Sequence, residues 1–251
     1  MSHKVVTAGM IVIGNEILSG RTKDKNLGYI AERLTALGIQ LREARFVADD
    51  MEAIADAVNA ARAKYDYVFI TGGIGPTHDD ITADALAHAF GVGIDHNPEA
   101  VAILEAHYEP GMLNEARLRM ARTPDGAVLV DNPVSRAPGF RVENVYVFAG
   151  IPAIMQAMFE GITHELTGSN PLHSRTVSAY LAEGVVAQRL GALQAQYPDV
   201  EIGSYPFYQI NRFGISIVLR CTDKARLDQA AEAYKQIVRE LGEEPIEGEI
   251  H

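Results

Sequence analysis

Cysteine, long apolar runs and a secretion signal are missing or nearly missing from this chain of 251 residues. Cys221 is the only cysteine, which excludes an intrachain disulfide and a cysteine-based zinc cluster and is typical of a reducing compartment. The longest apolar runs, residues 5–13 and 145–151, fall far below the roughly 20 residues that cross a bilayer. The N-terminus lacks the basic and apolar regions of a secretory signal. We therefore expect a cytoplasmic protein with no membrane partner.

Basic side chains are also in deficit, because 22 Lys and Arg stand against 33 Asp and Glu and leave a net charge of −11. This charge repels the phosphate backbone of DNA or RNA, so we expect no nucleic-acid partner. The sequence lacks a Gly-x-Ser-x-Gly elbow and a Gly-Lys-Ser/Thr phosphate loop, which disfavours serine hydrolases and P-loop ATPases. An acidic protein that binds phosphate commonly needs a divalent cation between its carboxylates and the ligand.

Apolar strand-like runs alternate with amphipathic helical segments from residue 5 onward. This order predicts an α/β fold, a three-layer arrangement with a mostly parallel sheet between helices and right-handed crossovers. The expected strands are residues 5–13, 39–47, 67–70 and 127–130, with a hairpin over 141–148 that turns near Glu143-Asn144. The expected helices are residues 25–37, a segment after Asp49-Asp50, and 81–90, 98–107, 113–122 and 152–166.

A break in the pattern at Gly168-Ser169-Asn170-Pro171 predicts a domain boundary. We therefore expect one domain over residues 1–167 and a small α+β domain over residues 171–251. The second has the order β-α-β-β-α, with strands at 174–181, 200–208 and 213–221 and helices at 183–196 and 223–241. Its expected role is assembly or substrate selection.

The strongest local signal is the glycine-rich segment Thr71-Gly72-Gly73-Ile74-Gly75-Pro76-Thr77-His78-Asp79-Asp80 between a strand and a helix. Glycines let the backbone approach a ligand, and free N–H groups at a helix start can hold phosphate. Ligands of open parallel sheets bind outside the carboxyl ends of the strands, where we expect residues 14–20 and 131–139 to join this loop. The predicted substrate-binding residues are Gly72, Gly73, Gly75, Thr77, Asn15, Ser19, Asn26, Asn132, Arg136, Pro138 and Gly139. The alternative is a tight strand-to-helix turn in which Thr77 and Asp80 form an approximate capping box.

Carboxylates beside this loop indicate a metal. Asp80 and Asp84 lie four residues apart on one helical face, where two like charges cost about 0.2–0.5 kcal/mol, and a function would explain that cost. We predict that Asp79 and Asp80 are catalytic and that they hold Mg²⁺, Mn²⁺ or Co²⁺ together with Asp84 and Glu16. The alternative is that Asp79 and Asp80 only complement the helix dipole.

Several ordered motifs together resemble the MoaB/Mog-type molybdopterin-binding domain in the version of competence/damage-inducible protein A (CinA), and also the related domain of FAD synthase. The motifs are Gly14-Asn15-Glu16-Ile17-Leu18-Ser19-Gly20, Asp24 with Asn26, the Gly72–Thr82 segment, Asn132-Pro133, Ala137-Pro138-Gly139-Phe140 and Gly150-Ile151-Pro152. The resemblance implies a three-layer α/β domain that binds molybdopterin or a nucleotide, and a small KH-like domain after Pro171. Two positions depart from the CinA pattern: Ile154 replaces an acidic residue and Ser135 replaces a glycine.

Three hypotheses follow. The first is a metal-dependent pyrophosphatase for a dinucleotide such as ADP-ribose or FAD, which the resemblance to CinA and FAD synthase implies. The second is a molybdopterin-binding protein of molybdenum-cofactor biosynthesis without hydrolase activity, and the third is a non-catalytic assembly module. A small domain of about 80 residues is marginally stable alone, so we also expect a homodimer in which residues 171–251 take part.

Overall fold

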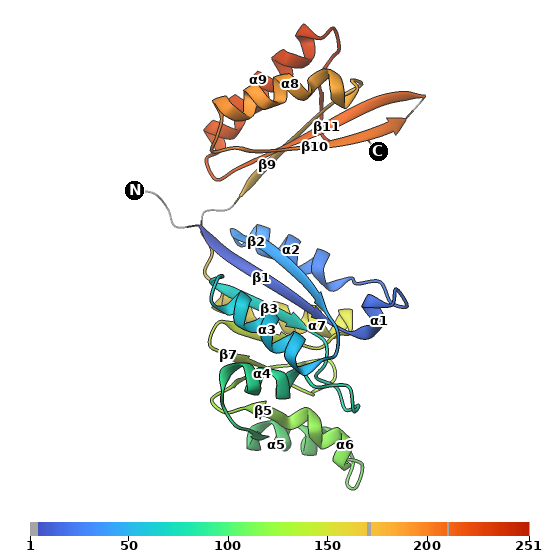
Figure 1. Cartoon of the computed structure of the whole chain (residues 1–251), viewed down its shortest axis with the longest axis vertical. Coiled ribbons are helices and arrows are strands. Elements are labelled where there is room, and N and C mark those ends of the chain that lie inside the picture. Colours follow the sequence, from blue (N-terminus) through green and yellow to red (C-terminus); the bar gives the residue numbers. More distant parts are fainter. Residues whose placement is uncertain (1–4, 170–171, 210, 251) are drawn as a thin grey trace. The chain divides into compact units, whose positions relative to one another are not determined.

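The computed structural model of the chain describes residues 5–169, 172–209 and 211–250 (Figure 1). The chain divides into two compact units, residues 1–169 and 170–251. None of the helices in the described ranges combines the length and apolar character that crossing a bilayer requires.

The first unit is built on a six-stranded sheet of order β2-β1-β3-β8-β7-β6. β1 (Val6–Ile13) lies parallel to β2 (Ile39–Val47) and β3 (Tyr67–Thr71), and β3 lies parallel to β8 (Val145–Phe148). The remaining strands, β7 (Gly139–Val142) and β6 (Val128–Val130), are antiparallel to their neighbours. The predicted mostly parallel sheet and the hairpin near Glu143 are confirmed.

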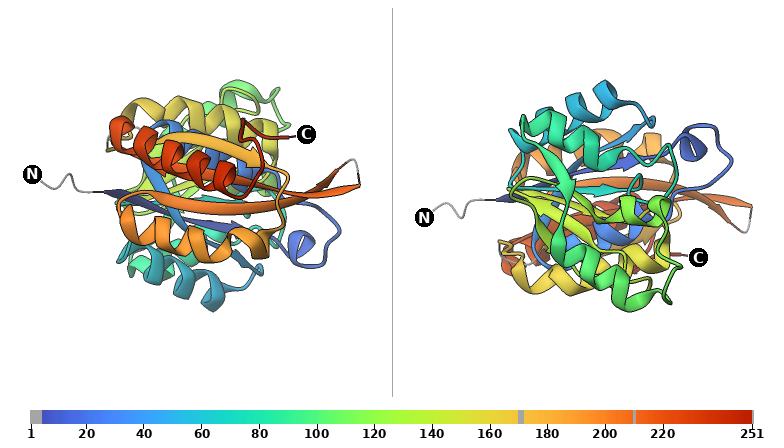
Figure 2. Two further views of the ribbon diagram at one scale, coloured as in Figure 1. Left: turned by 90° about the horizontal axis from the view of Figure 1, so that it is seen from above. Right: turned by 90° about the horizontal axis from the view of Figure 1, so that it is seen from below.

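Helices cover both faces of this sheet, as expected (Figure 2). α2 (Asn26–Ala36) and α7 (Pro152–Ile162) pack on one face, around an aromatic cluster in which the Phe159 ring meets Phe69 and Phe148 at centroid distances of 5.5 and 6.0 Å. α3 (Met51–Arg62) and α4 (Thr82–Phe90) pack on the other face, against the aliphatic side chains of β1 and β3. The two apolar faces of the sheet therefore explain the near-continuous apolar runs of its central strands.

The predicted helix at residues 113–122 is wrong in its extent. Only α6 (Glu115–Leu118) and the 3₁₀ turn η1 (Arg119–Ala121) are helical, and β5 (Arg122–Pro124) then pairs with β4 (Ile94–His96) beside α5 (Pro98–His107). Pro124 favours an extended conformation in the residue before it, which ends the helical pattern. Two further short helices, α1 (Asn15–Leu18) and the 3₁₀ turn η2 (Thr163–Glu165), lie in segments predicted as a loop and as the end of a longer helix.

The second unit is a four-stranded antiparallel sheet of order β10-β11-β9-β12 with two helices on one face (Figure 1). Its elements are β9 (His173–Ala179), α8 (Glu183–Gln196), β10 (Glu201–Gln209), β11 (Arg212–Cys221), α9 (Lys224–Glu240) and β12 (Ile246–Glu247). The predicted β-α-β-β-α order is confirmed, and Cys221 packs in the core as expected. Only β12 is absent from the prediction.

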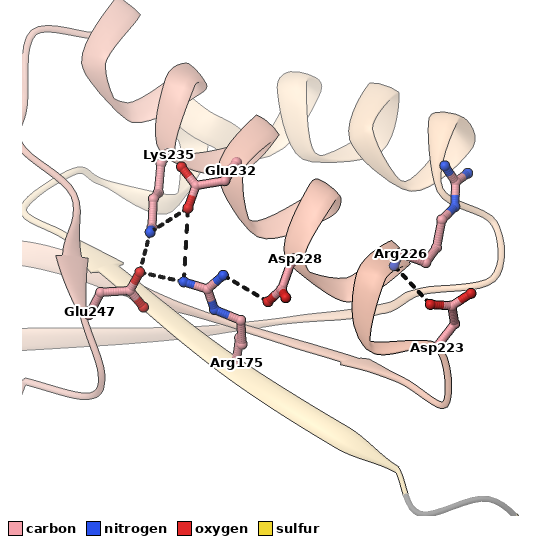
Figure 3. Close-up of polar contacts among 7 residues, drawn as sticks. All are labelled: Arg175, Asp223, Arg226, Asp228, Glu232, Lys235 and Glu247. Carbon is pink, nitrogen blue, oxygen red and sulfur yellow. Dashed lines mark hydrogen bonds and ion pairs between the residues drawn. The ribbon is translucent and has the colours of Figure 1, made fainter.

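An ion-pair network fixes β12 to the rest of this unit (Figure 3). The Arg175 guanidinium of β9 lies 2.5 Å from Glu247 and 3.0 Å from Asp228, and Lys235 of α9 contacts both Glu247 and Glu232. Hydrogen bonding to Lys235 holds the pKa of the Glu247 carboxyl below its usual value. The short C-terminal strand is therefore held by charged side chains more than by its two-residue ladder.

Candidate functional site

The glycine-rich loop begins where β3 leaves the centre of the sheet. Gly72 and Gly73 have φ angles of 101° and 69°, which L side chains rarely adopt. A Cβ atom at Gly72 would collide with the carbonyl oxygen of Ile13, and one at Gly73 would collide with the Thr82 hydroxyl. That hydroxyl donates to the Gly72 carbonyl at 2.9 Å, and the Thr82 amide donates to Gly73 at 3.0 Å. The fold itself therefore requires both glycines.

The backbone N–H groups of Gly73, Ile74 and Gly75 have no hydrogen-bond partner among the described residues, although these residues line a cavity of about 480 Å³. A run of free amides of this kind can bind an anion. The cavity has the size of a small-molecule site. Side chains from all three predicted loops line it, including Glu16, Asp80 and Asn132.

Asp80 closes the loop and also lines the cavity. Its Oδ2 accepts hydrogen bonds from the Thr77 amide at 2.8 Å and from the Thr77 hydroxyl at 2.5 Å. Its Oδ1 has no partner among the described residues. The predicted Thr77–Asp80 pair therefore exists, but it stabilises the loop, since α4 begins only at Thr82 and has no side-chain cap.

Asp79 and Thr77 do not line the cavity. The Asp79 side chain is 57% exposed and lies 3.8 Å from the exposed His78 imidazole. The nearby Thr77 hydroxyl, and then its own backbone N–H, lower the pKa of the Asp79 carboxyl. Of the two predicted catalytic residues, the geometry thus places Asp80 at the cavity and Asp79 in solvent.

Asp84 is expected as a metal ligand, but the structure gives it another partner. Both carboxylate oxygens accept hydrogen bonds from the Arg122 guanidinium, at 2.7 and 3.0 Å, and both side chains are only about a quarter exposed. This pair lines a small cavity together with Pro138, Arg119 and residues of the glycine loop. The Nε atom of Arg119 is buried there without a partner, which leaves a cation beside Gly73 and Gly75.

Residues of the third loop mainly hold the loop itself. The buried Asn132 amide donates to the Ser135 hydroxyl and to the Ala137 carbonyl, both at 2.7 Å, and its Oδ1 accepts from two backbone amides. Its side chain is thus already occupied within the loop. Arg136, at a φ of 63°, lies 3.7 Å from Asp131 and outside the main cavity. Gly139 lies at the start of β7, where a Cβ atom would collide with the Val147 carbonyl.

The first loop brings one of its predicted residues to the main cavity, namely Glu16. The Asn15 backbone N–H donates to the Asp49 carboxylate, which follows β2, and the Ser19 hydroxyl donates to the Glu16 carbonyl within the loop. Neither Asn15 nor Ser19 lines the cavity.

A second, smaller cavity of about 60 Å³ adjoins the first and shares Glu16, Thr22, Gly150 and Pro152 with it. Asn26 and Thr71 line it, and they are only 4% and 1% exposed. The Asn26 amide donates to the Gly150 carbonyl at 2.8 Å, but Asn26 Oδ1 and Thr71 Oγ1 are buried without a partner. Such a buried unpaired group costs about 1–3 kcal/mol.

Sequence patterns missed several residues of the two cavities. Met120, Ile151 and Ile154 supply apolar wall to the larger cavity, and Lys23 and Lys25 line the smaller one. The cluster of basic residues in the segment 21–25 is a sequence signal that could have pointed to the two lysines. No sequence signal points to Met120, because its position depends on the short helices that replace the predicted long one.

Within the described ranges, no group of three or more His, Cys, Asp or Glu side chains is arranged to hold a metal ion. The expected four-carboxylate cluster is therefore not assembled, because Asp84 pairs with Arg122, Asp79 lies outside the cavity and Glu16 belongs to another loop. Asp80 and Glu16 are the predicted carboxylates that line the larger cavity.

Comparison with known families assigns the chain. A family model described as "Probable molybdopterin binding domain" matches residues 9–168. The chain belongs to this family. A second model, described as "FAD synthase, middle domain", matches residues 171–246, so the two structural units correspond to two family matches. The resemblance read from the sequence motifs is confirmed.

Individual relatives agree with this assignment. The chain is 35% identical to a CinA-like protein from Citrifermentans bemidjiense over 90% of this chain and 57% of that one, and 31% identical to a "Probable FAD synthase" from Caenorhabditis elegans over 94% and 50%. It therefore spans only about half the length of these two relatives. The crystal structure of CinA from Thermoplasma acidophilum superposes with a TM-score of 0.61 at 34% identity, over 64% of this chain and 98% of that one.

Proposed function

We propose that this protein is a metal-dependent nucleotide pyrophosphatase that hydrolyses a dinucleotide such as ADP-ribose or FAD. The observation that carries the proposal is the run of free amides at Gly73–Gly75 beside the free oxygen of Asp80 in a cavity of about 480 Å³. Free amides suit the oxygens of a phosphate chain, and a carboxylate suits a cation bound to the same oxygens.

Basic side chains near the cavity support the proposal that the substrate is an anion. Arg119 has a buried, unpaired Nε beside Gly73 and Gly75, and Lys23 and Lys25 line the adjoining cavity without an ion pair in the described ranges. A protein with a net charge of −11 would otherwise repel a dinucleotide. These groups bind and orient the phosphate chain, while the apolar wall of Met120, Ile151 and Ile154 suits the flat face of a base or ring.

The cavity offers a divalent ion two carboxylate ligands, Asp80 and Glu16. Mg²⁺ is commonly held by one or two carboxylates together with substrate phosphates and water, so Asp80, with Glu16 as a second ligand, would hold it once the phosphates are present. The ion would supply positive charge to the phosphate oxygens and lower the pKa of the attacking water. Asp80 in turn stays ordered because Thr77 donates two hydrogen bonds to its other oxygen.

A second candidate is a molybdopterin-binding protein without hydrolase activity. It is favoured by the description of the matched family and by the absence of an assembled carboxylate cluster in the described part of the chain. The same cavity and amides would then hold the pterin phosphate.

One experiment separates the two candidates. Purified protein is incubated with ADP-ribose or FAD and with Mg²⁺, Mn²⁺ or Co²⁺, and the nucleotides are resolved by chromatography. Metal-dependent release of AMP supports the pyrophosphatase. Tight binding of a pterin with full recovery of intact ADP-ribose and FAD supports the alternative.

A further inference from the structure

The smaller cavity has polar groups with no partner of their own. Asn26 Oδ1 and Thr71 Oγ1 are both buried and unpaired, and both residues line this space. Thr71 ends β3 and Asn26 begins α2, so rigid elements hold both. A protein gains no stability from such unpaired oxygens, whereas a ligand that pairs with them gains affinity and specificity.

The chemistry of these two atoms limits what can bind. The Asn26 amide nitrogen donates to the Gly150 carbonyl, so the unpaired atom of this side chain is its oxygen. An amide oxygen can only accept, whereas the Thr71 hydroxyl can both donate and accept. A phosphate or carboxylate oxygen cannot pair with Asn26 Oδ1, since neither atom carries a hydrogen. Neighbouring hydroxyl groups can pair with both residues.

Size points the same way. One water molecule needs about 10–15 Å³ of cavity volume. A cavity of about 60 Å³ therefore has room for a few water-sized groups. That room suits the hydroxyl-bearing edge of a sugar more than a whole fused ring system. The larger cavity, with its apolar wall, is the place for a ring.

The charged side chains at the smaller cavity indicate a second chemical group of the ligand. Lys23 and Lys25 line it, are exposed, and have no ion pair in the described ranges. Of the two carboxylates that also line it, Asp24 accepts from the backbone N–H groups of Asn26 and Leu27, and Glu16 is shared with the larger cavity. Two free ammonium groups beside a hydroxyl-binding space fit a phosphate carried by the same sugar. The residues shared with the larger cavity, among them Thr22 and Gly150, let a ligand extend from one space into the other.

We propose that the smaller cavity is the sugar-phosphate subsite of the substrate: Asn26 and Thr71 bind sugar hydroxyls, and Lys23 and Lys25 meet the attached phosphate. This inference rests on the proposed function, since it assigns one half of the dinucleotide to one cavity. It makes Thr71 a specificity residue that selects a hydroxylated sugar.

The test uses ribose 5-phosphate as the probe and isothermal titration calorimetry on the full chain without metal. Thr71→Val removes the hydroxyl but keeps the shape, so affinity should fall about tenfold, equivalent to about 1.4 kcal/mol. The melting temperature of the same variant should rise, because a buried unpaired hydroxyl is removed from a strand in which valine is favoured. Thr71→Ser keeps the hydroxyl and should retain most of the affinity.

Matched variants and ligands provide the controls. Thr123→Val changes another buried threonine that lines neither cavity and should leave binding unchanged. Lys23→Gln with Lys25→Gln should weaken ribose 5-phosphate, whereas Lys224→Gln in the second unit should not. The unmodified protein should bind 2-deoxyribose 5-phosphate more weakly than ribose 5-phosphate, and Thr71→Val should narrow that difference.

Equal affinity of the unmodified protein and Thr71→Val for ribose 5-phosphate would overturn the subsite, and so would binding of inorganic phosphate as tightly as the sugar phosphate. Tighter binding of a pterin that depends on Thr71 would overturn it in favour of a ring. The AMP-release assay reports on the proposed function separately. Loss of sugar-phosphate affinity in Thr71→Val without any AMP release by the unmodified protein would leave the subsite standing and refute the pyrophosphatase.

Discussion

Asp80 lies in the loop before α4 and Asp84 in its first turn, and the structure gives them opposite roles that a pair of substitutions can separate. In Asp80→Asn the amide oxygen can still accept the Thr77 hydrogen bonds, so the loop keeps its shape while the cavity loses one of its two carboxylate charges. Because this loop is exposed, the cost in stability should stay below about 1 kcal/mol. Turnover should fall about 100-fold or more, the loss typical of removing a charge that stabilises a transition state.

Asp84→Asn should show the reverse pattern. It removes the ionic partner of Arg122, whose guanidinium donates two hydrogen bonds to the Asp84 carboxylate, in a pair only about a quarter exposed. Hydrogen bonds to charged groups contribute about 1.5–3 kcal/mol, so about 2 kcal/mol of unfolding free energy should be lost. For a unit of 150–250 residues this corresponds to a fall of about 4–8 °C in melting temperature. Turnover should change less than about tenfold.

Thermal denaturation by circular dichroism and initial-rate measurements of AMP release, on the same three preparations, give both quantities. Full activity in Asp80→Asn would remove that residue from the mechanism. An equal loss of turnover in both variants, with no loss of stability in Asp84→Asn, would refute the assignment of Asp84 to Arg122 and restore it as a metal ligand.

Three further predictions concern the loop, the pH dependence and the assembly. Gly73→Val should lower both the melting temperature and ligand affinity, because residue 73 has a positive φ and a Cβ atom there meets Thr82. Gly161→Ala, in α7 with no atom within 4 Å of the added Cβ, should leave ligand affinity unchanged and should not lower the melting temperature. Hydrogen bonding to Tyr65, and then to Arg45 and Lys64, lowers the pKa of Glu43 from 4.5 to about 2, so its stabilising contribution is complete above pH 4.5 and is lost as pH falls toward 2. Acid titration of the melting temperature should therefore be less steep in Glu43→Gln than in the unmodified protein, and identical slopes would count against this network. Light scattering should find that the full chain is a dimer and that a chain ending at Gly168 is folded but monomeric. The reason is that β10 is an edge strand on which Tyr205 and Tyr208 are exposed. A monomeric full chain would contradict the homodimer.

Much of the fold follows from local patterns in the sequence. The apolar runs of β1 and β3, the cap at Asn97 and the glycine at position 38 each act within a few residues, so the predicted limits of these elements agree with the structure to within one or two residues. The helix predicted after Asp49-Asp50 is present as α3. Residues 113–122 were misassigned because long-range contacts decide their structure. Arg122 reaches Asp84 across 38 positions, and β5 exists only where β4 pairs with it.

The candidate site shows the same division between local and long-range information. The glycine motif located the loop, because positive φ angles at Gly72 and Gly73 leave a strong trace in the sequence. Residue type alone does not distinguish Asp80, which lies at the cavity, from Asp79, which is exposed to solvent. It also does not show that the Asn132 side chain forms its hydrogen bonds within its own loop. The unpaired oxygens of Asn26 and Thr71 have no local signal, because these residues are far apart in the sequence and only the fold brings both to one small cavity.

Hydrolysis of ADP-ribose in ¹⁸O-labelled water, followed by mass spectrometry of the products, tests the central claim most directly. A pyrophosphatase adds one oxygen from water at a phosphorus of the broken bond. We therefore predict metal-dependent formation of AMP and ribose 5-phosphate in equal amounts, with one ¹⁸O atom in the phosphate of one of them. Asp80→Asn should form these products about 100-fold more slowly or slower still. Recovery of intact, unlabelled ADP-ribose with every metal tested, or formation of the labelled products by Asp80→Asn at the rate of the unmodified protein, would contradict the account.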